Sequence, residues 1–111
     1  MEKLRVRAFL LNEKTDVWED KGIVARNNFW PLAAPEKMDN GNWIMSGFQV
    51  NETGSGNNPP AVAISDGDDF TKWDVVVIPM KTEKVWGEST VIIDGSIIIN
   101  VARWGKQSIA L

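Results

Sequence analysis

Glu88 and Arg103 are the two residues of this chain whose types and spacing suggest chemistry. They lie at the two ends of a segment in which runs rich in β-branched residues surround Asp94-Gly95. Asp-Gly between two such runs is the strongest short-range signal for a β-hairpin. The hairpin brings a carboxylate and a guanidinium together at the open end of an otherwise apolar pair of strands.

The register of this hairpin follows from its turn. A two-residue loop at Asp94-Gly95 pairs Ile93 with Ser96 and places Glu88 opposite Val101. Arg103 shares a face with Val101, so Glu88 and Arg103 become diagonal neighbours, roughly 7–8 Å apart. The structural interpretation is an ion pair that orders the strand ends. The functional interpretation is a base beside an anion-binding group.

A second hairpin of the same design turns at Asn40-Gly41, 54 residues before the first. On that offset Trp43 corresponds to Ile97 and Met45 to Ile99. Two further short strands follow the second hairpin, so a four-stranded unit is expected from about residue 31 to residue 79. Four short antiparallel strands per period of about 50 residues are typical of a propeller blade.

The predicted fold class is therefore all-β, with antiparallel four-stranded blades. We expect one partial propeller over residues 1–111, divided into the end of one blade (1–28), a complete blade (29–80) and the start of another (81–111). The first part is expected to hold two strands joined by a turn that contains Trp18, and residues 107–111 to begin a strand. A propeller closes with about four to eight blades, so we expect a fragment of a longer protein. A small self-contained β-domain is the alternative.

Composition removes several function classes. The net charge is −3 and the 12 basic residues form no run, which argues against nucleic-acid binding. No apolar run approaches the length of a membrane span. Cysteine and histidine are absent, so thiolate catalysis, Ser-His triads and the commonest metal ligands are missing from this chain. We expect no cofactor and no metal site, and only carboxylates and lysines remain for acid–base work.

The chain has six tryptophans and no tyrosine. Trp43 and Trp73 lie within strand patterns and are expected to pack between sheets. Trp30 and Trp86 begin the first strand of each hairpin, at the same end as Glu88, and are candidates for stacking against a sugar. Trp104, which follows Arg103, is expected at the same end. Arg26 is a further candidate for substrate binding.

An acidic turn runs from Ser65 to Trp73 and contains three aspartates. Their spacing differs from that of a calcium loop with a distal glutamate. We interpret the segment as a tight turn held by hydrogen bonds from serine and aspartate side chains to the backbone.

These residues resemble the sialidase superfamily of β-propellers. Ser65, Thr71 and Trp73 are similar to the turn motif of its blades, although the aspartate, the glycine and the tryptophan are displaced. Gly87-Glu88-Ser89, the Asp94-Gly95 turn and Arg103 resemble the sialidase segment that carries a catalytic glutamate and a carboxylate-binding arginine. The Gly-Asn-Trp-Ile-Met stretch around Trp43 is similar to bacterial members.

The resemblance implies a six-bladed propeller, of which this chain covers about two blades. It implies a parent enzyme that hydrolyses terminal sialic acid or a related acidic sugar. Glu88 would activate a tyrosine nucleophile outside this chain, and Arg103 would bind the substrate's carboxylate. The segment alone would be inactive, its partners being a glycan and the remaining blades, and the parent would be secreted or periplasmic. A non-catalytic propeller that binds glycan or protein is the alternative, and an arabinan-degrading type of propeller glycosidase is a third.

Overall fold

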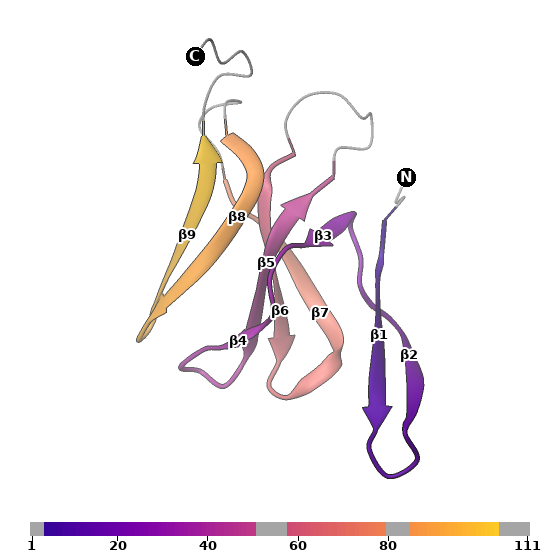
Figure 1. Cartoon of the computed structure of the whole chain (residues 1–111). Helices are drawn as coiled ribbons and strands as arrows, with labels where there is room; N and C mark the ends of the chain where they lie inside the picture. Colours follow the sequence, from indigo (N-terminus) through magenta and orange to yellow (C-terminus); the bar gives the residue numbers. More distant parts are fainter. Residues whose placement is uncertain (1–3, 51–57, 80–84, 105–111) are drawn as a thin grey trace.

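A computed structural model describes residues 4–50, 58–79 and 85–104 of the chain. These ranges contain nine strands and no helix, which confirms the all-β class (Figure 1). The strands are β1 Val6–Asn12, β2 Val17–Ala25, β3 Phe29–Pro31, β4 Glu36–Lys37, β5 Trp43–Gln49, β6 Pro60–Asp66, β7 Asp69–Val77, β8 Val85–Asp94 and β9 Ile97–Trp104. They form three antiparallel sheets: β1–β2, a central sheet of β3 to β7, and β8–β9.

The central sheet is a meander in which β5, β6 and β7 pair in sequence order. Its first strand is divided, because β3 and β4 pair with opposite halves of β5. Residues 32–35 separate the two pieces, and within them Leu32 still donates its N–H to the carbonyl of Ser46 (2.9 Å). Pro35 has no N–H for the ladder, which is consistent with the interruption. A four-stranded arrangement therefore exists over residues 29–77, with an edge strand less regular than expected.

Both faces of the central sheet are apolar. Alternate residues of β5 point to opposite sides, so Met45 belongs to one core and Ile44 to another. The first core comprises the buried residues Val24, Ala25, Phe29, Met45, Ala61, Ala63 and Trp73. The second core comprises Ile44, Val62 and Val91. Each core must be shielded from water on its outer side, and each of the two-stranded sheets packs over one core.

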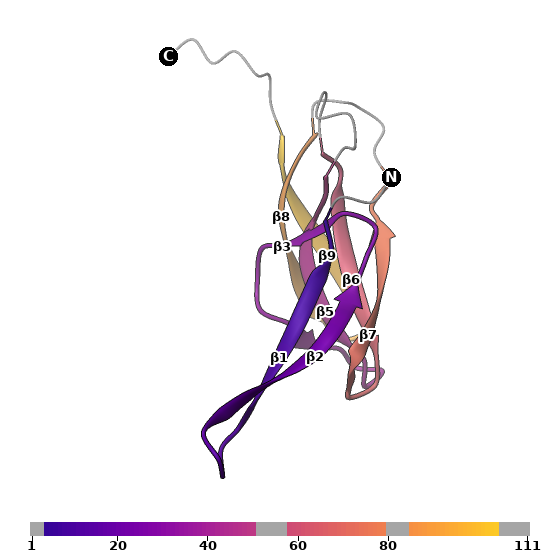
Figure 2. The ribbon, with the colours of Figure 1, turned by 90° about the vertical axis from the view of Figure 1, so that its right-hand side faces the viewer.

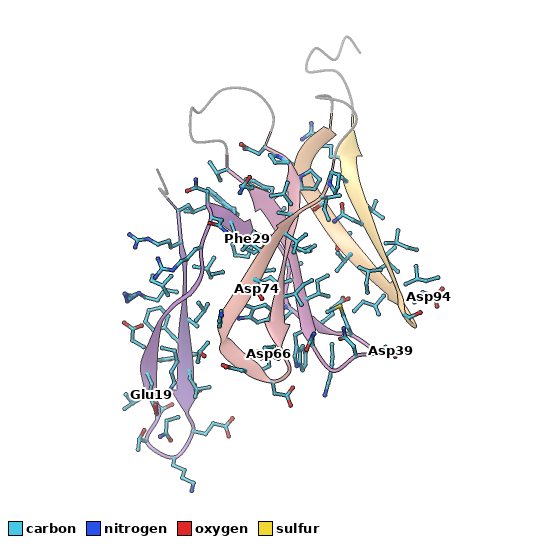
Figure 3. The ribbon with its side chains drawn as sticks, turned by 180° about the vertical axis from the view of Figure 1, so that it is seen from behind. Glu19, Phe29, Asp39, Asp66, Asp74 and Asp94 are labelled. Atoms are coloured by element: carbon cyan, nitrogen blue, oxygen red, sulfur yellow. The ribbon has the colours of Figure 1, made fainter. Side chains whose placement is uncertain are left out.

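The β1–β2 sheet covers the first core through β2, which lies beside β7, and the β8–β9 sheet covers the second core through β8 (Figures 1 and 2). The side chains of the central sheet therefore belong to two separate cores, one on each face. Figure 3 draws the described side chains from behind. Three sheets in sequence order thus form three layers.

The β1–β2 hairpin corrects one prediction. Trp18 lies within β2, opposite Leu11, and not in the turn. The turn ends at Asp16, which takes a positive φ of 59°, and the side chain of Asn12 accepts hydrogen bonds from the N–H groups of Lys14 and Thr15. These contacts close the turn before Val17, so strand pairing resumes earlier than the sequence indicated.

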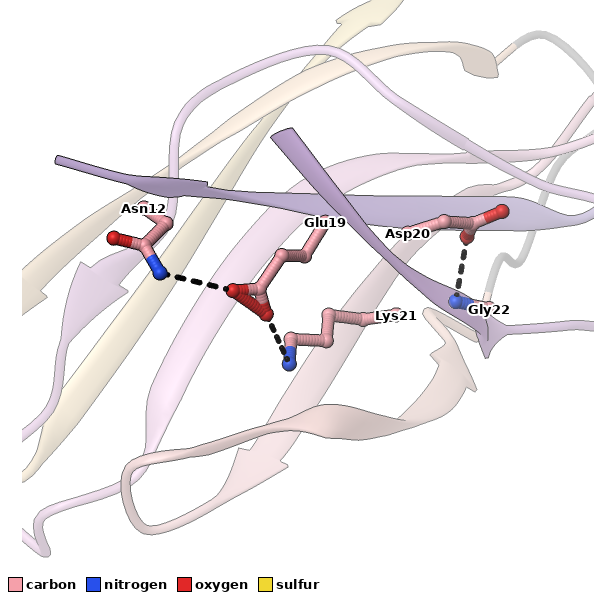
Figure 4. A network of polar contacts seen from close by, with 5 residues as sticks. All are labelled: Asn12, Glu19, Asp20, Lys21 and Gly22. Atoms are coloured by element: carbon pink, nitrogen blue, oxygen red, sulfur yellow. Dashed lines mark hydrogen bonds and ion pairs between the residues drawn. The ribbon is translucent and has the colours of Figure 1, made fainter. Parts of the chain in front are cut away.

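Polar side chains support the twisted part of β2 (Figure 4). Glu19 accepts hydrogen bonds from the side chains of Asn12 (3.4 Å) and Lys21 (3.3 Å). Asp20 accepts one from the N–H of Gly22 (2.8 Å), where φ is 81°. The register shifts in this region between Ala8 and Phe9, and such irregularities increase local twist.

The two hairpins that the sequence repeat relates differ in the register of their strand pairing. In the central sheet Trp43 lies opposite Lys37, six residues earlier, whereas Ile97 lies opposite Asp94, three residues earlier. A register difference of an odd number of residues exchanges the faces of a strand pair. Trp43 accordingly packs against the first core, while Ile97 is exposed.

Gly47 allows β3 and β5 to approach each other. A Cβ atom at Gly47 would lie 2.0 Å from the backbone oxygen of Trp30. Because that oxygen belongs to the backbone, the clash could be removed only if the edge strand moved away. The preceding residue, Ser46, is buried and its Oγ has no hydrogen-bond partner among the described residues.

We predict opposite effects for two neighbouring substitutions. Gly47→Ala should destabilise the chain by at least about 3 kcal/mol, because the methyl group overlaps the Trp30 carbonyl. Ser46→Ala should be neutral or stabilise by up to about 1 kcal/mol, because it removes an unpaired buried hydroxyl. Denaturant unfolding of both variants checks this. Equal stability of Gly47→Ala and the native chain would contradict the close approach.

We also predict that the isolated chain associates or unfolds readily. Its outer faces expose large apolar side chains, among them Phe9 (55 % exposed) and Trp18 (64 %) on one end layer and Ile97 (59 %) on the other. Exposed apolar sheet faces drive association in water. Light scattering and thermal melting measure both properties, and Phe9→Lys should reduce association. A monodisperse monomer with a sharp melt would indicate a self-sufficient domain instead.

Candidate functional site

The structure brings Glu88 and Arg103 into direct contact across β8 and β9. The Arg103 Nη1 atom donates a hydrogen bond to Glu88 Oε2 at 2.9 Å. The side chains are 62 % and 53 % exposed, respectively. Val91 packs against the central sheet, so alternation places Glu88 on the outer face of the hairpin, together with Ile92. The pair therefore lies at the end of an exposed apolar face.

The contact forms in a register different from the expected one. Asp94 pairs with Ile97, so the loop is Gly95-Ser96 and not Asp94-Gly95. Gly95 has a φ of 59°, as the first residue of a type II′ turn requires. This turn needs a positive φ only at glycine, whereas the Asp94-Gly95 turn needs it at the aspartate too. The shift places Glu88 level with Arg103 instead of diagonal to it.

A bulge lies immediately beside the pair. The ladder runs regularly from Asp94↔Ile97 to Ser89↔Ala102 and next resumes at Val85↔Trp104. Three residues of β8, 86–88, therefore face Arg103 alone. Bulges re-aim side chains and are frequent next to active sites. Glu88 is the last residue of this bulge.

Two of the other predicted site residues, Trp30 and Arg26, line clefts of their own. Trp30 is half exposed on β3 and stacks on Phe48 (5.6 Å between ring centroids, 15° between planes). With Arg5 and other residues it lines an open cleft of about 310 Å³. Arg26 follows β2 and lines a different cleft of about 310 Å³, facing residues 71–75 of β7. Neither of these clefts includes Glu88 or Arg103.

Trp86 belongs to β8 and Trp104 to β9, but their side chains lie outside the described part of the structure. Their predicted role at the sugar site therefore stays a prediction. Trp73 is buried in the first core and the partly buried Trp43 packs against it, as predicted.

Sequence reasoning missed Ser89, which connects the site to the central sheet. Its Oγ donates a hydrogen bond to the carbonyl of Gly47 (3.1 Å) and accepts one from Asn100 (3.4 Å). The first bond holds β8 against β5 and the second joins β8 to β9, one residue away from Glu88. A serine next to the candidate carboxylate was the only available signal.

The acidic turn is held by hydrogen bonds from serine and aspartate side chains to the backbone, as predicted. Ser65 Oγ donates to the carbonyl of Gly67 (2.7 Å) and accepts the N–H of Trp43 (2.8 Å). Asp68 accepts the indole N–H of Trp43 (2.9 Å), and Asp69 accepts the N–H of Thr71 (2.9 Å). Two of the turn's carboxylates are thus engaged within the protein. Across the described ranges, no group of three acidic side chains gathers at distances that would suit a metal ion.

Comparison with known proteins gives no relative: the chain matches no protein-family model, no curated protein and no solved structure. The stretches that the structure describes contain no helix long and apolar enough to cross a membrane. The geometry of the Glu88–Arg103 pair is therefore the main support for a function.

We predict a titration that reports on the acidic turn. The Thr71 hydroxyl, followed by its N–H, lowers the pKa of Asp69 below the usual 3.8 by hydrogen bonding to the ionised carboxylate. Thr71→Val should raise that pKa, whereas Thr71→Ser, which keeps the hydroxyl, should not. Because the folded-state pKa is lowered, the stabilisation is present above 3.8 and lost as the pH falls below it. An NMR titration of the Asp69 carboxyl that is identical in both variants would contradict this.

Proposed function

We propose that this chain supplies part of the active site of a sialidase-type exo-glycosidase. In this proposal Glu88 is the base that activates a tyrosine nucleophile, and Arg103 binds the carboxylate of sialic acid or a related acidic sugar. The chain contains no tyrosine, so the nucleophile lies outside these 111 residues. The observation that carries the proposal is the 2.9 Å contact between Glu88 and Arg103 beside a bulge.

The two side chains suit these roles. A phenol is a weak nucleophile at its ordinary pKa and requires an adjacent base, which an exposed carboxylate provides. Sialidases are the glycosidases that use tyrosine in place of a carboxylate nucleophile. A guanidinium binds a planar carboxylate through two parallel hydrogen bonds. Arg103 already binds one carboxylate, that of Glu88, and a substrate carboxylate has the same chemistry.

We further propose that the three sheets are consecutive parts of a β-propeller. The central sheet is an antiparallel meander of β5, β6 and β7 with a divided edge strand, β3 and β4, and each of its faces packs against a neighbouring sheet. Stacked four-stranded sheets are the architecture of propeller blades. β1 and β6 also occupy positions that are 54 residues apart, 6–12 and 60–66, in keeping with a repeat. The proposed blades are the segments 1–28, 29–80 and 81–111, and the remaining blades are the chain's partners.

A non-catalytic propeller that binds glycan or protein is the second candidate. The observation in its favour is the exposure of the ion pair, because exposed pairs between strands commonly serve only to order the strand ends. In that case the pair contributes at most about 1 kcal/mol to stability and takes part in no reaction.

Kinetics of an enzyme that contains this segment separate the two candidates. Glu88→Gln keeps the shape and removes the base, so kcat on a sialoside should fall by about 10²–10⁴-fold. Arg103→Lys should mainly raise KM for the sialoside and leave a neutral glycoside unaffected, because a point charge cannot form the bidentate contact.

Glu36→Gln is the matched control, since Glu36 is an exposed strand carboxylate on β4. It should leave both constants unchanged. If Glu88→Gln behaves like this control on the sialoside, the pair is a structural ion pair and the catalytic proposal fails.

A further inference from the structure

The β8–β9 hairpin contains two registers. Near the turn the paired residues are Asp94↔Ile97, and the pattern continues to Ser89↔Ala102. At the open end Val85 pairs with Trp104, which is two residues out of step with the turn. The bulge at residues 86–88 absorbs this difference.

The register at the open end corresponds to another turn that the sequence allows. Counting without interruption from Val85↔Trp104 leads to Ile93↔Ser96, which leaves Asp94-Gly95 as a two-residue loop. Asp-Gly is a preferred type I′ turn, and Gly-Ser fits the type II′ turn that the structure adopts. The segment Asp94-Gly95-Ser96 therefore encodes two turns whose registers differ by two residues.

Burial does not choose between these registers. A slip of two residues keeps every side chain on its own face of the hairpin. Val91 and Ile93 face the central sheet in both cases. Ile98 lies opposite Ile93 in the observed register and would lie opposite Val91 in the slipped one. Either register therefore sets Ile98 opposite an apolar residue that faces the second core. The Glu88–Arg103 contact, in contrast, depends on the register.

We propose that the turn at residues 94–96 positions Glu88 relative to Arg103. The Gly95-Ser96 turn places the two side chains level with each other, in ion-pair contact at 2.9 Å. The Asp94-Gly95 turn moves β9 by two residues, brings Val101 opposite Glu88 and leaves Arg103 on the diagonal. Asp94 and Ser96 are therefore positioning residues for the pair.

The catalytic consequence rests on the proposed function. While Glu88 lies level with Arg103, a substrate carboxylate must compete with the Glu88 carboxylate for the Arg103 guanidinium. The slipped register separates the base from the anion-binding group and keeps both on the same face. The turn then determines which of the two arrangements the site adopts.

Disulfide trapping tests the register directly, because the chain has no native cysteine. The pair next to the turn-closing pair is not hydrogen-bonded to each other in an antiparallel ladder, and its Cα atoms lie about 4.5 Å apart, within reach of a disulfide. Ile93→Cys with Ile98→Cys reports the observed register. Ile92→Cys with Ile97→Cys reports the slipped one.

Two turn variants should move the result in opposite directions. Asp94→Thr disfavours a positive φ at position 94 and should retain the Ile93–Ile98 cross-link. Asp94→Asn combined with Ser96→Thr creates Asn-Gly followed by a strand former, and should shift the cross-link ratio toward the Ile92–Ile97 pair by about tenfold. The same ratio in the native, Asp94→Thr and double-variant backgrounds would overturn the proposal.

Two NMR measurements make the test independent of the cysteines and of catalysis, and they use a protein that contains this segment, with isotope labels confined to residues 85–104. Hα–Hα contacts should join Ile93 to Ile98 in the native chain and Ile92 to Ile97 in the double variant. Glu88→Gln should shift the side-chain nitrogen resonances of Arg103 strongly in the native turn and weakly in the double variant. An equal response in both backgrounds would refute the positioning role. Failure of the proposed function would show only in the sialoside kinetics and would leave these readouts unchanged.

Discussion

A sheet whose two faces are both apolar must be covered on both sides, and this constraint organises the described structure. Met45 and Ile44 are neighbours in β5, yet they belong to separate cores on opposite sides of the sheet. Covering only one face would leave the other in water, at a cost of about 25 cal/mol for each Å² of apolar surface. The β1–β2 and β8–β9 sheets meet this requirement. The outer faces of these two sheets in turn expose large apolar side chains to water.

Polar contacts join the turn that precedes β5 to the turn between β6 and β7, at one end of the central sheet. Asn42 accepts the N–H of Gly67, while Ser65 and Asp68 bind the backbone and the indole of Trp43. Phe70 lies edge-to-face with Trp43 (5.5 Å between ring centroids) and stacks on Trp73 (5.9 Å). These contacts fix the ends of β5, β6 and β7 together. The opposite end, where Glu88 and Arg103 lie, depends on Ser89 and the bulge.

Much of this arrangement could be predicted from the sequence. Runs of β-branched residues and Asn-Gly or Asp-Gly turns identified the hairpins, and alternation placed Glu88 and Arg103 on one face. The register could not be predicted, because Asp94-Gly95-Ser96 satisfies two turn types and a slip of two residues keeps each isoleucine of the run 97–99 on its own face. The position of Trp18 was missed because Asn12 closes the preceding turn with its side chain, a contact that spacing does not reveal. The divided edge strand depends on how closely Gly47 lets β3 approach.

The order of strands has a consequence for how the chain folds. Strands that follow one another in the sequence pair with one another in β1–β2, β4–β5–β6–β7 and β8–β9, and among the described strands only β3 pairs across another strand. Closing a short loop costs little entropy, so each sheet assembles from contacts that are local in the sequence. The two cores form only when sheets dock. We therefore expect the stacking of layers to be the slow step in folding, and substitutions in the cores to slow it more than substitutions in the turns.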